Sequence, residues 1–257
     1  SSASAWATRC WLARSAPAAS TTARSCQAAE RCNGAMCAMA GSAPGSPYQP
    51  ESIVGGVSNV MIVPPKSEAT KPLDIVAAAK AKPGELTFSS GGAGTSHHLS
   101  GVLFGQVTDT KLVHVPYKGA PQGVQAVMAG EVAMGFFNTP TVISHVKGGL
   151  ARPLGVTSLK RSPLLPDVPT LDEQGIKGYE VNTWFGFVAP AGTPPDVVAK
   201  LNAELNRIFA SQEAKDKLGP QGFDLAPPMA PATFGKLIVD DLAKWVPIVK
   251  AAGATAN

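Results

Sequence analysis

From Ile53 to the end of the chain, short β-branched or apolar runs alternate with segments of helical periodicity, and this alternation constrains the fold most. Alternating strands and helices with short connections form a mostly parallel sheet that helices cover on both faces. The sequence therefore predicts an α/β fold whose ligands bind at the carboxyl ends of the strands. The strand-like runs are 53–57, 60–63, 86–89, 112–115, 132–137, 154–157 and 179–188.

Three local features refine this prediction. The runs within 53–63 predict a strand pair or one bent strand, where the chain can cross between domains. Thr193 is expected to cap the N-terminus of a helix that has Pro194 at its first position. Pro247 interrupts the apolar stripe of the last helix, so we expect a kink or break there.

Length and charge narrow the class of protein. The 257 residues suffice for one large domain or for two lobes of roughly 100 to 150 residues, and we expect two lobes. The net charge of +4 arises mainly from four arginines within the first 50 residues. In the remainder, Lys and Arg are interspersed with acidic residues, so we expect no nucleic-acid partner. No apolar run approaches the roughly 18 residues of a membrane span.

Residues 1–46 differ from the remainder of the chain. They lack Val, Ile, Phe, Lys and Asp, show no hydrophobic periodicity and contain all four cysteines. The cysteine spacing does not match a zinc site, and we expect no metal. Such a segment can be a disordered or transit-like extension, and its apolar run 11–13 is too short for a secretory signal. A sharper hypothesis is that it is a GC-rich gene read out of frame.

A loop rich in Gly, Ser and Thr connects the run 86–89 to a helix, and it is the most informative motif in the chain. Free backbone N–H groups and hydroxyls at a helix N-terminus form an anion site, which suits a carboxylate as well as a phosphate. The loop is not a P-loop, because no Gly-Lys-Ser/Thr follows. It can equally be a tight turn that ends in a helix cap. The candidate ligand-binding residues here are Ser90, Gly91, Gly94, Thr95 and Ser96.

Two adjacent histidines, His97 and His98, follow this loop. On a helix they point about 100° apart, so they cannot share one metal ion. No acidic residue lies near them in sequence, so a catalytic dyad is not indicated. His97 is a candidate for contacting a bound anion, and a buried or surface structural role is the alternative.

Four further candidates lie where the next strand-like runs end. Tyr117 and Lys118 follow one run, and Asn138 and Thr139 follow the next, so three loops can converge on one crevice. Lys118 can meet a carboxylate or simply be solvated. Trp184, on the returning strand, can line the cleft or pack in a core.

Several motifs, in their order and spacing, resemble the Bug family, the periplasmic substrate receptors of tripartite tricarboxylate transporters. The resemblance covers about residues 50–255. The motifs are Val60–Pro65, Ala79–Gly84, Ser89–Leu99, His114–Gly119, Lys160–Thr170 and Trp184–Pro194.

The resemblance implies a two-lobed periplasmic binding-protein fold, similar to type II, in which two strands cross between the lobes. It implies a small carboxylate ligand, membrane transporter subunits as partners and a periplasmic location. Lobe one is expected to be incomplete, because the family's first strand, its Pro-Gly-Gly loop and the following helix are missing. We expect residues 47–61 and 178–257 to form the remnant of lobe one and residues 62–177 to form lobe two, with 1–46 as the anomalous segment.

A second departure from the family is Phe137, where an Asp often stands. Without that acid, the ammonium of an amino acid would lose a partner, so we expect a dicarboxylate or an aromatic acid. We predict a monomeric receptor without cofactor or catalytic activity, because the loops offer Ser, Thr, Gly and Asn but no placed acid or base. The alternatives are an effector-binding or sensory module of the same fold and a hydrolase.

Overall fold

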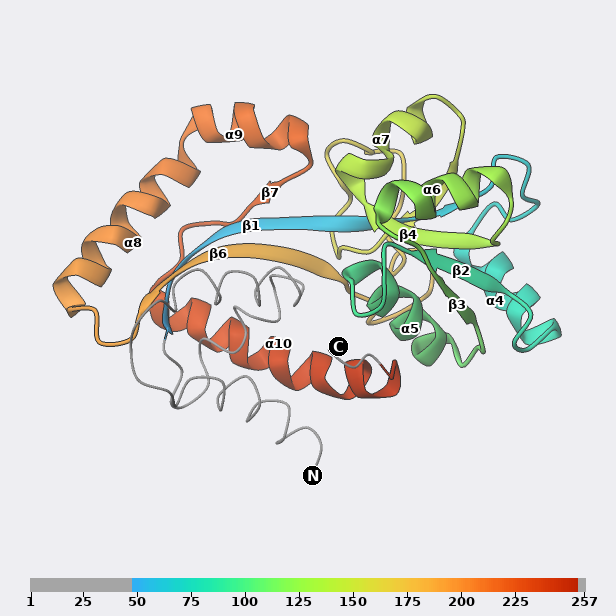
Figure 1. Cartoon of the computed structure of the whole chain (residues 1–257). Coiled ribbons are helices and arrows are strands. Elements are labelled where there is room, and N and C mark those ends of the chain that lie inside the picture. The colour runs from blue at the N-terminus through green and yellow to red at the C-terminus, as the bar shows by residue number, and fades with distance from the viewer. Residues whose placement is uncertain (1–47, 254–257) are drawn as a thin grey trace.

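The computed structural model describes residues 48–253 of the 257-residue chain. The hypotheses about residues 1–46 and their cysteines fall outside the described residues. Figure 1 shows two groups of elements joined by two long strands, β1 (Tyr48–Val63) and β6 (Asn182–Pro190). The α/β class and the two-lobed arrangement predicted from the sequence are confirmed.

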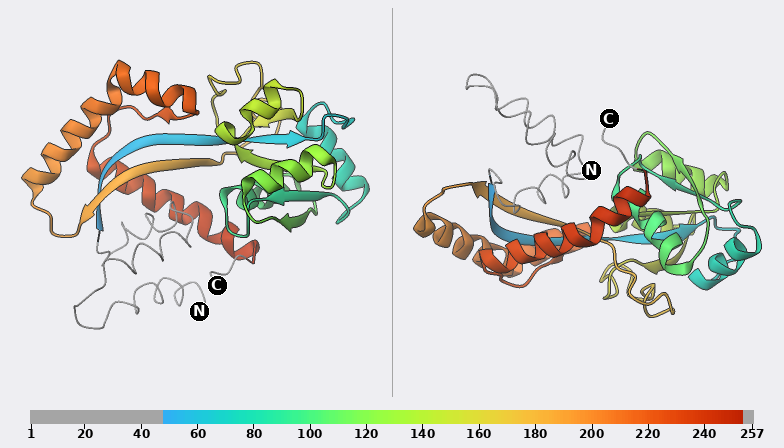
Figure 2. Two further views of the ribbon diagram at one scale, coloured as in Figure 1. Left: turned by 45° about the horizontal axis from the view of Figure 1, so that its top comes forward. Right: turned by 90° about the horizontal axis from the view of Figure 1, so that it is seen from below.

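Strand β1 extends through both lobes. From Tyr48 to Ser58 it pairs with β6, and from Asn59 onward it pairs with strands of the second lobe. Register shifts interrupt both pairings, and Figure 2 shows that the strand curves. Of the two alternatives for residues 53–63, one bent strand is therefore correct. The strand partners of β1 change between residues 58 and 59, from β6 to β4. The predicted boundaries of the two lobes stay a prediction.

Lobe two contains a sheet in the order β3-β2-β4-β1-β5, in which β2 pairs in parallel with both β3 and β4. Strand β1 pairs antiparallel with β4 and β5, so the sheet is mixed and the prediction of a mostly parallel sheet is wrong. Helices cover both faces of this sheet. One face packs a cluster that includes Phe88, Phe104 and Phe136, and the other packs a cluster that includes Val124 and Phe137. The elements are α4 (Pro72–Ala81), β2 (Thr87–Ser90), α5 (Ser96–Thr108), β3 (Val113–Pro116), α6 (Ala120–Ala129), β4 (Met134–Asn138), α7 (Thr139–Lys147) and β5 (Arg152–Val156).

The described part of lobe one is smaller. It contains β6, the two-residue strand β7 (Asp224–Leu225), α8 (Pro195–Ala210), α9 (Gln212–Leu218), a 3₁₀ turn (Gly219–Gln221) and α10 (Pro231–Ala251). Strands β6 and β7 pair with β1. Helix α10 buries one apolar face against the cluster that includes Phe88, Phe104 and Phe136. Within residues 48–253, β6 has no strand partner other than β1.

Two helix predictions need correction. The helix predicted after Thr193 starts at Pro195 with Pro194 as its N-cap, because the Thr193 hydroxyl donates to the Pro190 carbonyl instead. The last helix continues through Pro247 from residue 231 to 251 without a break. Trp245 and Ile248 are buried on either side of the proline, so packing holds the helix together where a hydrogen bond is lost.

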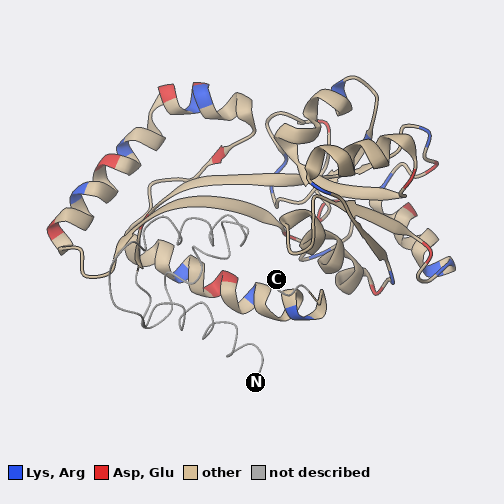
Figure 3. Ribbon diagram, viewed as in Figure 1, with Lys and Arg blue, Asp and Glu red and all other residues tan. Residues whose placement is uncertain are grey.

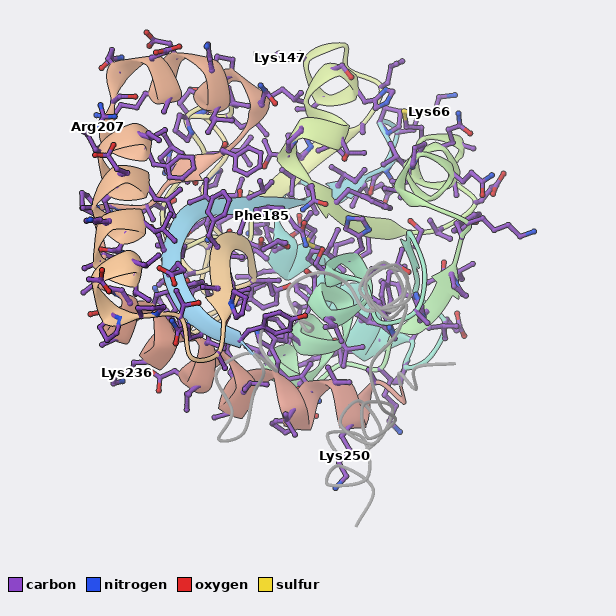
Figure 4. All side chains as sticks on the ribbon, turned by 60° about the vertical axis from the view of Figure 1, so that its left-hand side comes forward. Lys66, Lys147, Phe185, Arg207, Lys236 and Lys250 are labelled. Atoms are coloured by element: carbon purple, nitrogen blue, oxygen red, sulfur yellow. The ribbon has the colours of Figure 1, made fainter. Side chains whose placement is uncertain are left out.

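Charged residues are dispersed over this fold. Figure 3 shows acidic and basic positions interspersed along α8, α9 and α10. Figure 4 labels Arg207 on α8 and Lys236 on α10 at the periphery, and Phe185 on β6 beside the curved part of β1. Among the helices of residues 48–253, none is both long and apolar enough to cross a membrane.

Candidate functional site

The loops predicted to converge do meet at one edge of the lobe-two sheet. Strands β2, β3 and β4 are parallel and end there, and β1 enters the sheet at the same edge because Asn59 pairs with Asn138. The Tyr117 amide donates to the Ser90 carbonyl at 3.0 Å, which joins the ends of β2 and β3. The edge therefore brings together the loops that follow three strands, as expected for a ligand site in an α/β fold.

Residues 90–98, here called the anion loop, are held by their own hydrogen bonds. The Ser90 hydroxyl donates to the Gly92 carbonyl and accepts from the Gly92 amide, at 3.0 and 3.1 Å. The Thr95 hydroxyl donates to the Gly92 carbonyl at 2.8 Å and accepts from the His98 amide at 3.4 Å. Thr95 is thus the N-cap of α5, and its hydroxyl also shapes the loop.

The anion loop retains donors for a ligand. The backbone amides of Ala93, Ser96 and His97 and the Ser96 hydroxyl have no hydrogen-bond partner among residues 48–253. Ser96 and His97 are the first two residues of the 13-residue helix α5, where the helix dipole favours an anion. This arrangement can bind a carboxylate without a charged side chain.

His97 supports the loop through both nitrogens of its ring. Its Nδ1 accepts from the Gly91 amide at 3.4 Å, and its Nε2 lies 3.0 Å from Oδ1 of Asn138. The ring also packs against Phe137, with centroids 4.9 Å apart. Burial lowers the pKa of His97, and the Asn138 hydrogen bond partly opposes this, so the ring is neutral at pH 7. A direct contact between His97 and a ligand stays a prediction.

His98 and His114 form a stacked pair beneath the loop. Their ring centroids are 3.7 Å apart, and Phe88 packs against both rings. His98 Nδ1 accepts from the Gly94 amide at 3.1 Å, and His114 Nε2 lies 2.6 Å from the Ser90 hydroxyl. Burial, together with the neighbouring His98, lowers the pKa of His114 to about 4. The pair therefore supports the anion loop in its uncharged form.

We predict that acid destabilises the protein through this pair. Between pH 6.5, the ordinary pKa of His, and about 4, the unfolded state binds a proton that folded His114 excludes. The contribution of His114 is therefore complete above pH 6.5 and is lost as the pH falls to about 4. Because the ring is partly exposed to solvent, this loss is on the order of 2 kcal/mol, less than the roughly 3 kcal/mol of a fully buried ring. Thermal unfolding from pH 7.5 to 4 should show a shallower decline for His114→Gln than for wild type. An unchanged decline in His114→Gln, or an equal change in the control His145→Gln, would contradict the assignment.

The other predicted residues differ in their burial and in their hydrogen-bond partners. The Tyr117 hydroxyl donates to Glu131 at 3.3 Å, so it is engaged at the surface, beyond the C-terminal end of α6. Lys118 is exposed, and its ammonium has no partner among the described residues. Thr139 is fully buried and donates to the Ser58 carbonyl at 3.0 Å. Lys118 and the free donors of the loop are therefore the groups available to a ligand.

Trp184 is not part of this cluster. Its indole N–H donates to Asp241 on α10, and its ring packs edge-on against Phe234. With Asp224 and Lys244 it lines a groove of about 560 Å³ along α10, which contains no residue of the anion loop. Of the two alternatives for Trp184, packing in a core is therefore the one observed. A contact between Trp184 and a ligand stays a prediction.

Ser58 and Asn59 belong to the site but were not predicted from the sequence. Both are buried on β1: Ser58 contacts Thr139 at the start of α7, and Asn59 contacts Asn138 at the end of β4 and Ser100 in α5. The available signal was a Ser-Asn pair between Val57 and Val60 inside the otherwise apolar run 53–63. A buried polar pair requires hydrogen-bond partners, which the neighbouring loops supply.

The two hydroxyls at the start of α5 should have separable roles. Ser96→Ala removes a free donor, so we expect carboxylate binding to weaken by about 0.5 to 1.5 kcal/mol with little change in stability. Thr95→Ala also removes the cap, at about 1 kcal/mol of folding stability. Calorimetric titration and thermal unfolding of both variants and of the double variant test this. Wild-type affinity in the double variant would show that the loop is only a tight turn with a helix cap and does not bind the ligand.

Comparison with known proteins identifies the family. The sequence model of the family described as "Tripartite tricarboxylate transporter family receptor" matches residues 8–254. The chain belongs to this receptor family. The match begins well before residue 50, where the resemblance in the sequence began, and it includes most of the segment 1–46. The hypothesis of a shifted reading frame in that segment stays a prediction.

Individual relatives agree with this assignment. A UPF0065 protein from the tcbD-tcbE intergenic region of a Pseudomonas species is 35% identical over 221 residues, which is 83% of this chain and 66% of the relative. Protein BugT of Bordetella pertussis is 32% identical over 217 residues, or 82% and 66% of the two chains. A solved R. palustris structure with adipate is 30% identical, with a TM-score of 0.70 over 82% of this chain and 70% of its own. The chain thus spans about two thirds of the length of these two curated relatives.

Proposed function

We propose that this receptor captures a small carboxylate in the periplasm and delivers it to the membrane subunits of a tripartite transporter, without catalysing a reaction. The observation that carries the proposal is the set of unpartnered donors at the N-terminus of α5, within three converging loops. Such donors recognise an anion through hydrogen bonds and the helix dipole. The relative solved with adipate supports a carboxylate as that anion.

The composition of the loops favours binding over catalysis. Residues 90–98, 117–119 and 138–139 contain no Asp or Glu, and His97 and His98 use ring nitrogens to hold the loop backbone. A hydrolase would need a nucleophile with an oriented base. A receptor needs donors that are already in place before the ligand arrives, because preorganisation reduces the cost of binding.

The ligand class follows from what the loops lack. Phe137 is fully buried with its ring against His97, so this position offers no carboxylate to an α-ammonium group. Lys118 provides a cation at the edge of the site for a second carboxylate. We therefore propose a dicarboxylate, or an aromatic acid, in preference to an amino acid.

A thermal-shift screen tests the proposed function. Adipate, malate, benzoate and glutamate should be compared at equal concentration, with adipamide as the matched neutral control. At about 100 times the dissociation constant a ligand adds about 2.7 kcal/mol of stability, which is readily measured. We expect stabilisation by adipate or benzoate and none by adipamide. Stabilisation by adipamide equal to that by adipate, or no stabilisation by any acid, would contradict the proposal.

A further inference from the structure

Asn59 occupies the point at which β1 leaves one lobe and enters the other. Its neighbour Ser58 pairs with Asn182 of β6, whereas Asn59 itself pairs with Asn138 of β4. The side chain is only 1% exposed, although it carries an amide. A buried amide at a crossing between lobes must be hydrogen-bonded, and its partners indicate what it holds in place.

The backbone of Asn59 connects the two crossing segments. Its amide donates to the Thr157 hydroxyl and its carbonyl accepts from the Thr157 amide, both at 2.9 Å. Thr157 in turn donates to the Val181 carbonyl at 2.6 Å and accepts from the Val181 amide at 2.9 Å. Val181 directly precedes β6, so Thr157 joins the outgoing and returning strands.

The side chain of Asn59 connects this junction to the anion loop. Its Nδ2 donates to the Ser100 hydroxyl at 2.9 Å, and Ser100 donates to the Ser96 carbonyl in the first turn of α5. Its Oδ1 accepts from Nδ2 of Asn138 at 2.9 Å. Each polar group of Asn59 therefore has a partner, and two of these partners lead to the proposed ligand donors.

The direction of these hydrogen bonds determines the protonation of His97. Because Nδ2 of Asn138 points to Asn59, Oδ1 of Asn138 faces Nε2 of His97 and must accept a proton from it. On the other side of the ring, Nδ1 accepts from the Gly91 amide. The network is consistent with one form of His97 only, the neutral ring with its proton on Nε2.

We propose that Asn59 is a positioning residue for ligand binding: it fixes the tautomer of His97 and ties the anion loop to both crossing segments. The inference rests on the proposed function, because the loop is the proposed carboxylate site. Asn59 need not touch the ligand. It keeps the amides of Ser96 and His97 in register with the strands that connect the two lobes.

The tautomer can be measured directly in the ligand-free protein. Long-range ¹H–¹⁵N NMR of the histidine rings at pH 7 should show His97 neutral and protonated at Nε2. Asn59→Leu removes both side-chain hydrogen bonds while keeping the same number of side-chain heavy atoms, and should give a mixture of tautomers, with adipate affinity reduced about tenfold. Asn59→Asp retains an acceptor for Asn138, so it should preserve the wild-type tautomer. If Asn59→Leu folds poorly, the tautomer and the adipate affinity of Asn59→Asp still test the inference.

A matched control is available in lobe one. Asn202 donates its amide to the Glu51 and Met229 carbonyls, so Asn202→Leu also removes a structural amide but should leave the His97 tautomer and adipate affinity unchanged. The inference is wrong if wild-type His97 carries its proton on Nδ1, or if Asn59→Leu retains both the tautomer and the affinity. Failure of the proposed function would look different, because wild type would then not bind adipate while the tautomer would still be Nε2–H.

Discussion

Gly91→Ala is expected to weaken adipate binding by more than about tenfold while the protein stays folded. A β-carbon at this position would lie 2.8 Å from the Ala120 amide nitrogen and 3.1 Å from both the Gly119 carbonyl carbon and Nδ1 of His97. Two of these neighbours are backbone atoms and the third is a hydrogen-bonded ring, so none can move aside cheaply. The loop itself must move, and the amides of Ser96 and His97 move with it.

The control for this variant is Gly219→Ala, because a β-carbon at Gly219 would meet no atom within 4 Å. Calorimetric titration with adipate and thermal unfolding should be measured for both variants. We expect Gly219→Ala to bind as wild type does. Wild-type affinity in Gly91→Ala would mean that the contact between the ends of β2 and β3 does not shape the ligand site.

Replacement of residues 1–46 by the first-lobe segment of the family is expected to have the second large effect. Within residues 48–253, β6 has one strand partner, and its Phe185 and Phe187 side chains are 45% and 46% exposed. The chain also spans only 66% of BugT. A receptor holds its ligand by closing two walls around it, so a complete first lobe should tighten adipate binding by about tenfold or more.

This comparison needs two proteins and one titration. The chain as given and a version with a family-like first lobe, obtained by shifting the reading frame or from BugT, should each be shown to fold and then titrated with adipate. Tighter binding and a higher melting temperature are expected for the second version. Equal affinity would mean that residues 1–46 already contribute what the first lobe provides.

Local sequence patterns predicted the arrangement of lobe two well. The strand before the Gly/Ser/Thr loop, a helix cap at the end of that loop and the convergence of loops at Ser90, Tyr117 and Asn138 all follow from short-range features. These features depend on neighbours in sequence and on a rule that parallel strands end at one edge. The helix start near Thr193 was misplaced by one residue because its hydroxyl donates to the Pro190 carbonyl and does not cap the helix.

Long-range packing explains what the sequence could not predict. Helix α10 continues past Pro247 because buried side chains on either side hold it, which no propensity rule describes. The role of Asn59 depends on Ser100, Asn138 and Thr157, which lie 41 residues or more away in sequence. Such networks can be recognised only once the strands are paired, so Asn59 was not predicted.

The central claim is that the anion loop binds the carboxylate, and backbone NMR tests it most directly. Adipate should be titrated into ¹⁵N-labelled protein while the amide signals are followed in a ¹H–¹⁵N correlation spectrum. The amides of Ala93, Ser96 and His97 should show the largest shifts, because they are the unpartnered donors at the start of α5. The largest shifts at Trp184, Asp224 and Lys244, which line the groove along α10, would instead contradict the account.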